Sequence, residues 1–279
     1  MKVAVLSGKG GTGKTFVSVN LAAVAGRAVY VDCDVEEPNG NLFLPPESTA
    51  VEPVETLLPS IDAVRCTACR ACVDFCRFGA LAYAGGTVRV LPSICHSCGG
   101  CALVCPAGAV NETVRAVGRV ERGRHGMVSV VTGVLNPGEA SGIPVIRAAL
   151  RYAAKPEAVT VIDCPPGSAC AVMECIAVAD CCLLVTEPTA FGLHNLRMVA
   201  ELAALLGKPR GIIENRARSS YTPLNDYARA SGIPILARIP YSEQIAQGNA
   251  EGKLACEHSA ISRRQFNRLL RLLETGACV

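Results

Sequence analysis

Near its N-terminus the chain reads Gly8-Lys9-Gly10-Gly11-Thr12-Gly13-Lys14-Thr15, between an apolar run at residues 1–5 and a helical pattern at residues 15–25. Glycines in this context let backbone N–H groups close around a polyphosphate, and the start of the helix adds a favourable dipole. Lys14 can reach the terminal phosphate oxygens, and the Thr15 hydroxyl can hold Mg²⁺. The motif therefore predicts a nucleotide site formed by the residues Gly8, Gly10, Gly11, Thr12, Gly13, Lys14 and Thr15.

The rest of the chain alternates between apolar runs and helical patterns. The apolar runs lie at residues 28–31, 128–134, 159–163, 181–186, 211–214 and 235–239. The helical patterns lie at residues 143–154, 168–178, 190–206 and 222–230. Strands that alternate with helices favour a parallel sheet with right-handed crossovers. We expect an α/β fold with a doubly wound, mostly parallel sheet of the P-loop NTPase type.

Eight of the sixteen cysteines form two runs with one spacing, C-x2-C-x2-C-x3-C. This spacing holds two [4Fe–4S] clusters, and the fourth cysteine of each run binds the other cluster. Zinc is the alternative for paired C-x2-C segments, but two four-member runs with the x3 step, the second followed by Pro106, favour iron–sulfur. The first cluster should be held by Cys66, Cys69, Cys72 and Cys105, and the second by Cys95, Cys98, Cys101 and Cys76.

The cysteine runs belong to an internal repeat of about 30 residues, in which each run is followed by a Gly-Ala pair. Residues 45–59, before the repeat, are rich in Pro, Glu and Ser and look like a linker. We expect a first ATPase part at residues 1–59 and a second at residues 117–279. Residues 60–116 would form an inserted α+β ferredoxin domain of the bacterial two-cluster type.

Lys9 is not required by an ordinary phosphate loop. With it, the run from Lys9 to Thr15 resembles the deviant phosphate loop of the MinD/ParA family, which includes the nitrogenase iron protein and cluster-carrier ATPases. The resemblance implies a homodimer that forms on ATP binding, in which Lys9 reaches the nucleotide of the opposing subunit, much as an arginine finger acts in trans.

Three further segments extend this resemblance. Asp32-Cys33-Asp34 looks like the first switch, and Asp34 would orient the attacking water; Asp32 could equally be ordinary strand-end turn chemistry. The segment around Asp163 looks like the second switch, with Asp163 holding Mg²⁺ through water. Asn215 and Pro240 resemble the positions that contact adenine. The implied catalytic residues are Lys9, Lys14 and Asp34.

Composition limits the remaining possibilities. A net charge of +3 and an aromatic content of 4% argue against a general nucleic-acid partner. The N-terminal segment does not fit a secretion signal, no run of about 18 apolar residues is present, and the many cysteines suit a reducing cytoplasm, in a low-oxygen organism if clusters are exposed. Residues 261–274 form a basic amphipathic pattern; packing on the sheet is favoured over membrane contact.

Together the chain resembles MinD-superfamily ATPases with an inserted ferredoxin domain. The resemblance implies ATP or ADP, Mg²⁺ and two [4Fe–4S] clusters as cofactors, and slow, partner-stimulated hydrolysis. Three roles stay open, in this order: assembly or delivery of a metallocofactor, ATP-gated electron donation to a redox partner, and positioning of the MinD/ParA kind with redox-sensing clusters. Cys170, just past the second switch, is either a dimer-bridging metal ligand or a packing residue.

Overall fold

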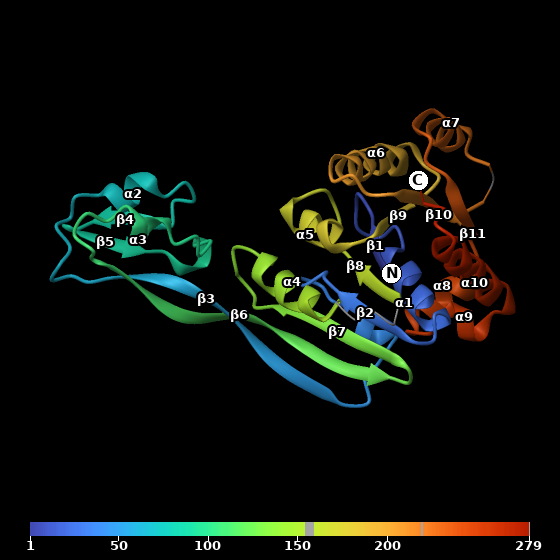
Figure 1. The fold of residues 1–279 in the computed structure, drawn as a ribbon, viewed down its shortest axis with the longest axis horizontal. Coiled ribbons are helices and arrows are strands. Elements are labelled where there is room, and N and C mark those ends of the chain that lie inside the picture. The colour runs from blue at the N-terminus through green and yellow to red at the C-terminus, as the bar shows by residue number, and fades with distance from the viewer. Residues whose placement is uncertain (154–158, 219, 279) are drawn as a thin grey trace.

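The computed structural model describes residues 1–153, 159–218 and 220–278, and in these residues a nine-stranded sheet forms the centre of the molecule (Figure 1). Its strand order is β11-β10-β9-β1-β8-β2-β7-β6-β3. Seven neighbouring strands run parallel: β1 (Lys2–Leu6), β2 (Ala28–Asp32), β7 (Val128–Leu135), β8 (Val159–Asp163), β9 (Cys181–Thr186), β10 (Arg210–Ala217) and β11 (Ile235–Pro240). The predicted doubly wound, mostly parallel sheet is confirmed.

Helices cover both faces of this sheet, because alternate residues of each strand point to opposite sides. On one side, Ala4 and Leu6 of β1 pack with α4 (Ile143–Leu150), α5 (Cys170–Val178), α6 (Ala190–Leu205) and α7 (Thr222–Ser231). On the other side, Val3 and Val5 pack with α1 (Lys14–Val24), α9 (Ala255–His258) and α10 (Ala260–Glu274). The remaining helix of this region, α8 (Glu243–Ala250), precedes α9.

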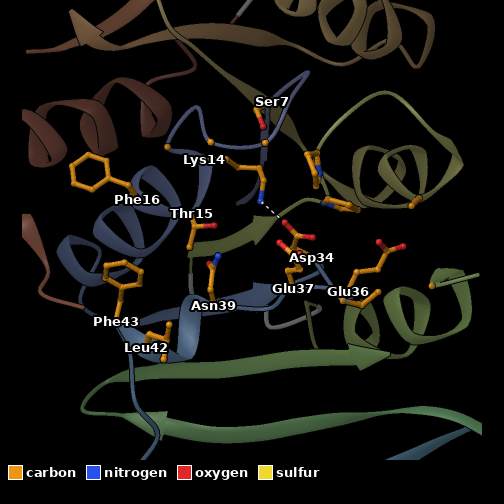
Figure 2. Close-up of a pocket in the computed structure, with 18 of the residues that line it drawn as sticks. Ser7, Lys14, Thr15, Phe16, Asp34, Glu36, Glu37, Asn39, Leu42 and Phe43 are labelled. Atoms are coloured by element: carbon orange, nitrogen blue, oxygen red, sulfur yellow. Dashed lines mark ion pairs between the residues drawn. The ribbon is translucent and has the colours of Figure 1, made fainter. Parts of the chain in front are cut away.

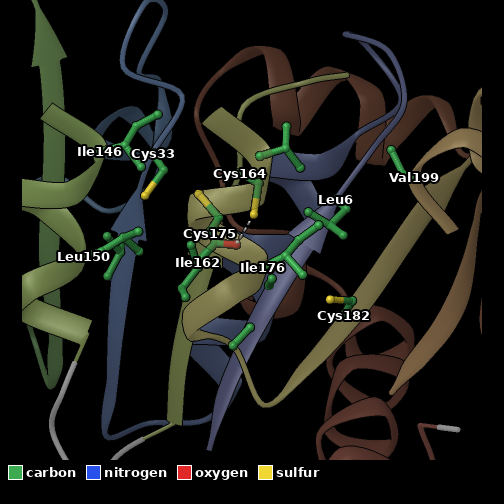
Figure 3. Close-up of a cluster of buried hydrophobic side chains, with 14 of the residues drawn as sticks. Leu6, Cys33, Ile146, Leu150, Ile162, Cys164, Cys175, Ile176, Cys182 and Val199 are labelled. Atoms are coloured by element: carbon green, nitrogen blue, oxygen red, sulfur yellow. Dashed lines mark hydrogen bonds between the residues drawn. The ribbon is translucent and has the colours of Figure 1, made fainter. Parts of the chain in front are cut away.

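Several cysteines outside the two runs contribute to the core. Cys33, Cys164 and Cys175 converge between β2, β8 and α5, and Cys182 lies on β9 (Figure 3). All four are fully buried, and Cys181 is buried on the opposite face. The interpretation of Cys33, Cys181 and Cys182 as packing residues is therefore confirmed.

The C-terminal helix uses its apolar face for packing. Phe266, Leu269 and Leu273 of α10 are buried, and the Phe266 ring meets Phe16 of α1 edge-on at 5.8 Å between ring centroids. This is the packing arrangement that was expected over membrane contact. In the part of the chain that the structure describes, no helix combines the length and the apolar character needed to cross a bilayer.

Two antiparallel strands extend the sheet and then leave it. β6 (Val110–His125) pairs with β7 only from Gly118 onward, whereas β3 (Thr49–Ile61) pairs with β6 over its whole length. Residues 110–117 and their partners in β3 therefore form a two-stranded ribbon. This ribbon carries residues 62–109 away from the sheet (Figure 1).

The linker predicted at residues 45–59 is wrong, because β3 begins at Thr49. Pro53 and Pro59 suggested a break, since proline donates no ladder hydrogen bond. However, β3 is the edge strand, with β6 as its neighbour, and an edge strand tolerates proline.

Residues 62–109 form a small lobe, called here the cysteine module. It contains the short helices α2 (Ala71–Phe75) and α3 (Gly100–Leu103) and the hairpin of β4 (Leu81–Ala84) and β5 (Thr87–Val90). Its buried cluster consists of Cys72, Leu81, Val88 and Cys101. The helix predicted at residues 143–154 is α4 followed by a short 3₁₀ turn (Arg151–Ala153); Ala154 and the C-terminal Val279 lie outside the described residues.

Candidate functional site

The predicted phosphate loop joins β1 to α1 with a tightly packed backbone. Gly13 has φ +91°, and a Cβ there would lie 2.1 Å from Nδ2 of Asn215, so only glycine fits. A Cβ at Gly8 would lie 2.3 Å from the carbonyl oxygen of Asn195 on α6. The Asn215 side chain in turn donates a hydrogen bond of 2.7 Å to the Thr12 carbonyl. The loop is thus fixed from two sides by contacts within the chain.

Lys14 lies at the base of this loop among carboxylates. Its Nζ donates to Oδ1 of Asp163 at 2.7 Å. The same Nζ lies 3.5 Å from Oδ2 of Asp34 (Figure 2). Burial by itself would lower the pKa of Lys14, but the charges of Asp163 and Asp34 outweigh it, and the pKa lies above its ordinary value. Lys14 is therefore a buried cation held by the two predicted switch carboxylates.

Asp32 lies next to this charge cluster and is fully buried. Burial, followed by the nearby charge of Asp163, raises the pKa of Asp32 to about 7. Its carboxylate accepts N–H bonds from Asp34 (3.1 Å) and Gly40 (3.0 Å). The Tyr30 hydroxyl lies 3.0 Å from Oδ2 of Asp163 and 3.3 Å from Oδ2 of Asp32. Asp32 thus fixes the turn that carries Asp34.

A cavity of about 640 Å³ opens above Lys14. Its lining includes the loop residues Gly10, Gly11, Gly13, Lys14 and Thr15 together with Asp34 (Figure 2). A second cavity of about 130 Å³, lined by Asn215 and Pro240 among others, adjoins it and shares Gly13, Phe16, Arg216 and Asn249 with it. The structure brings these predicted residues together around one elongated hollow.

Three predicted loop residues, Gly8, Lys9 and Thr12, do not line the hollow. Gly8 packs on α6, and the Thr12 side chain is buried. Asn249 of α8 was not predicted, although it lines both cavities. Its buried Oδ1 finds no hydrogen-bond partner among the described residues. No sequence signal identified Asn249, because α8 itself was not expected.

Lys9 does not extend into the hollow. Its Nζ lies 3.2 Å from Oε2 of Glu187, which follows β9, and 5.2 Å from the centre of the Phe191 ring on α6. Glu187 uses its other oxygen to bind Arg216. In this structure Lys9 therefore contacts groups of its own protomer.

The cysteine module contains two cavities, and each collects four cysteines. Cys66, Cys69, Cys72 and Cys105 line one of about 10 Å³. Cys76, Cys95, Cys98 and Cys101 line the other, of about 240 Å³. Each cavity thus combines three cysteines of one run with the fourth of the other, which is the grouping expected from the spacing.

The backbone of the two runs follows one pattern. Left-handed residues recur at matching positions, Ala68 (φ 55°) with Ser97 (φ 52°) and Arg70 (φ 66°) with Gly99 (φ 73°). A Ser97 N–H lies 3.5 Å from the Cys95 sulfur. Hydrogen bonds from backbone N–H groups, that of Ala109 first, lower the pKa of Cys105. Such N–H groups favour thiolates, the form that binds metal.

Among the described residues, no three His, Cys, Asp or Glu side chains stand close enough to ligate a single metal ion. A cubane has a different requirement, because its four thiolates bind four different iron atoms and so stand farther apart than the ligands of one ion. The iron–sulfur assignment stays a prediction. Cys170, exposed at the first position of α5, likewise keeps both of its interpretations.

Known proteins resemble this chain over most of its length. Residues 3–255 match the family model described as the CobQ/CobB/MinD/ParA nucleotide binding domain. The chain is 30% identical over 222 residues to the uncharacterized protein MJ0578 of Methanocaldococcus jannaschii, covering 77% of this chain and 78% of that one. It is 27% identical to the uncharacterized ATP-binding protein MJ0823 of the same organism, covering 99% and 100%.

Solved structures show the same fold. The septum site-determining protein MinD of Pyrococcus horikoshii, complexed with Mg-ADP, superposes with a TM-score of 0.61 at 20% identity, covering 99% of this chain and 96% of that one. The cell division ATPase MinD of Pyrococcus furiosus gives 0.60 at 19% identity, covering 98% of both chains. At these identities the likeness concerns the fold alone.

Proposed function

This chain belongs to the CobQ/CobB/MinD/ParA nucleotide-binding family, and from that membership we propose that it is an ATP-hydrolysing switch of the MinD/ParA type. The observation that carries the proposal is the charge cluster around Lys14 at the base of a cavity large enough for a nucleotide. The name of the relative MJ0823 and the Mg-ADP complex of the Pyrococcus horikoshii protein support ATP and Mg²⁺ as its ligands.

Mg²⁺ fits the donors that surround Lys14. Asp34, Asp163 and Asp32 lie with one lysine in a buried site, so carboxylates outnumber cations, and oxygen ligands are those that Mg²⁺ prefers. Thr15 and Asp163 would hold the ion, which would neutralise phosphate charge. Lys14 would then exchange its carboxylate partners for phosphate oxygens.

Each remaining residue has a defined task in hydrolysis. The loop N–H groups and Lys14 hold the phosphates, and Asp34, on the turn fixed by Asp32, orients the attacking water. Asn215 and Pro240 would contact the base from the adjoining cavity. Lys9 would act across the interface of a homodimer that closes on ATP, so hydrolysis stays slow in the separate protomer.

We further propose that the cysteine module holds two [4Fe–4S] clusters. The observations that favour it are the two cavities with crosswise sets of four cysteines and the matching loops around them. When bound, such clusters accept and donate single electrons. The ribbon of β3 and β6 ties the module to the sheet that also carries Asp32 and Asp163.

The comparisons favour a MinD/ParA-like role over the assembly or delivery of a metallocofactor, which was the first expectation. We therefore propose a nucleotide switch whose clusters sense or relay redox state. Three outcomes separate the roles in anaerobic preparations. ATP-dependent binding to lipid or DNA, whatever the cluster state, supports positioning; iron transfer to an apo-protein supports assembly; ATP-dependent oxidation of reduced clusters by an acceptor supports electron donation.

The ATPase proposal is tested by nucleotide binding and phosphate release with and without Mg²⁺. Lys14→Ala should weaken ATP binding by at least tenfold and abolish hydrolysis, and Lys14→Arg, which keeps the charge, should bind but hydrolyse poorly. Lys253→Ala, which removes an exposed lysine paired with Glu251, serves as the control. Equal ATP binding by Lys14→Ala and the wild type would contradict the proposal.

A further inference from the structure

Glu187 joins two cations beside the nucleotide hollow, one from the phosphate loop and one from β10. Its Oε2 lies 3.2 Å from Nζ of Lys9, in the phosphate loop, and its Oε1 accepts a hydrogen bond from Arg216, which lines both cavities. Both carboxylate oxygens are therefore in use. The Glu187 side chain is 14% exposed and that of Lys9 27%, so this contact is better shielded from water than an ordinary surface pair.

The backbone around Glu187 is rigid. Its carbonyl oxygen accepts the Thr189 N–H at 2.8 Å, and Thr189 caps α6 by accepting the Gly192 N–H at 2.9 Å. A Cβ at Gly192 would lie 2.3 Å from the Glu187 carbonyl oxygen, so the helix start is pressed against this residue. These contacts fix the backbone that carries the Glu187 carboxylate.

Lys9 is held against the same helix start. Its Nζ lies 5.2 Å from the centre of the Phe191 ring, within the range of a cation–π contact. The Ser7 hydroxyl donates to the Lys9 carbonyl at 2.9 Å, and the preceding residue, Gly8, touches Asn195 of α6. Glu187 and Phe191 together thus form a seat that fixes the Lys9 ammonium within its own protomer.

From this geometry we propose that Glu187 is a positioning residue that stores Lys9 in cis and releases it when nucleotide binds. The inference rests on the proposed function, in which Lys9 acts on the partner's nucleotide. A bound triphosphate brings rival anions next to the loop that carries Lys9. These anions compete with Glu187 for the Lys9 ammonium, so nucleotide binding favours release of Lys9.

This arrangement predicts the direction of a charge-removing variant. In Glu187→Gln the carboxylate charge is lost while the side-chain shape is kept, so before nucleotide binds Lys9 has lost its ion pair and keeps only the Phe191 contact. The ATP concentration that gives half-maximal dimer should fall about three- to tenfold, and hydrolysis at low protein concentration should rise by a similar factor. Glu187→Asp keeps the charge on a shorter side chain and should restore part of the wild-type behaviour.

The test has two readouts. The first is the rate at which the Lys9 amine of the nucleotide-free protein is acetylated by acetic anhydride, measured by peptide mass spectrometry with Lys2 as the internal reference. The second is the dimer fraction during a titration with Mg-ATP, measured by light scattering on the whole, iron-loaded protein. Glu251→Gln, which breaks a different Glu–Lys pair, serves as the matched control.

Faster acetylation of Lys9 in Glu187→Gln together with a lower ATP requirement for dimerisation supports the proposal. Unchanged acetylation overturns it, because Lys9 was then not held by Glu187. Faster acetylation with an unchanged ATP titration also overturns it, because the contact then does not regulate pairing. If the wild type fails to bind ATP, the proposed function fails, whereas the acetylation rate still shows whether the seat exists.

Discussion

Lys14, Asp34 and Asp163 are far apart along the chain but meet at one end of the sheet, which has nine strands in the part of the chain that the structure describes. The positive charge of Lys14 is paired there with the negative charges of Asp34 and Asp163. The eight cysteines of the module instead all come from residues 66–105, and half of the module's buried cluster consists of two of them, Cys72 and Cys101. The two regions should therefore depend on a ligand for folding to different extents. Side chains that would bind the nucleotide are held by the sheet and by one another, whereas the buried cluster of the module includes side chains that would themselves bind a cluster.

The module also lacks a core large enough to be stable alone. Phe75 and Phe78 are each 47% exposed, and Leu81 and Val88 are the only apolar residues besides cysteine in its buried cluster, among the residues described. Lobes of this size usually depend on metals or disulfides. The binding free energy of a metal centre then becomes folding free energy.

Removal of iron should change the protein most. Oxidation of the iron-loaded protein and chelation of the released iron should raise amide exchange in residues 62–109 to nearly the unfolded rate, whereas β1 and β8 should stay protected. Hydrogen exchange measured by mass spectrometry on both states of the same sample reads the two regions together. Slow exchange in residues 62–109 after complete iron loss would contradict the proposal that the module depends on bound clusters for its fold.

Single cysteine variants provide the control for that experiment. Cys101→Ser should lose about half of the iron and the protection around the cavity that Cys76, Cys95, Cys98 and Cys101 line. Cys170→Ser changes an exposed cysteine outside the module and should keep the full iron content if Cys170 is not a bridging ligand. Equal iron content in Cys101→Ser and the wild type would remove the cluster assignment.

The buried carboxylates of the nucleotide site should give a smaller effect, a dependence of unfolding free energy on pH. The pKa of Asp32 is about 7 in the folded protein, because of burial first and then the charge of Asp163, and about 4 in an unfolded chain. The folded state therefore binds the extra proton. Its stabilising contribution is complete below about pH 4 and is lost as pH rises through 7.

Between pH 4 and 7 the nucleotide-free protein should thus lose on the order of 4 kcal/mol of unfolding free energy from this group. The pKa of Asp34 is also raised, chiefly by burial, and acts in the same direction. Asp32→Asn should remove most of the slope, and Asp226→Asn, at an exposed pair with Arg229, should not. Urea unfolding at pH 5 and pH 7.5 measures both; an identical pH slope in Asp32→Asn and the wild type would show that Asp32 is not the titrating group.

The sequence predicted some parts of both regions and missed others. Strong local patterns predicted β8, β9 and α6 almost to the residue, and the cysteine spacing predicted which thiols share a cavity. The ribbon was missed because Pro53 and Pro59 masked an edge strand. Glu187 and Asn249 were missed because their roles depend on β9, β10 and α8 meeting in space, which no local pattern records.

Substitution of two neighbouring glycines of the module, Gly99 and Gly100, should have the weakest effects. Gly99 has φ 73°, and an added Cβ would meet only Oε1 of Glu112, at 3.7 Å, so Gly99→Ala costs backbone strain alone, about 1 kcal/mol. At Gly100 an added Cβ would lie 2.2 Å from the Phe75 ring, so Gly100→Ala should cost more, about 1–3 kcal/mol.

Both variants change the same turn. A loss of stability in Gly99→Ala reports backbone strain, whereas a further loss in Gly100→Ala reports the clash with Phe75. The iron-loaded variants should differ in the urea concentration at which the cluster absorbance is lost, with Gly100→Ala the lower. In the first run the position equivalent to Gly99 is Arg70, whose guanidinium lies 4.1 Å from the centre of the Tyr83 ring. That contact offsets part of the strain at Arg70. Arg70→Gly should therefore change the urea midpoint less than Gly99→Ala does. A larger change would show that the two cysteine runs do not depend on the same left-handed backbone conformation.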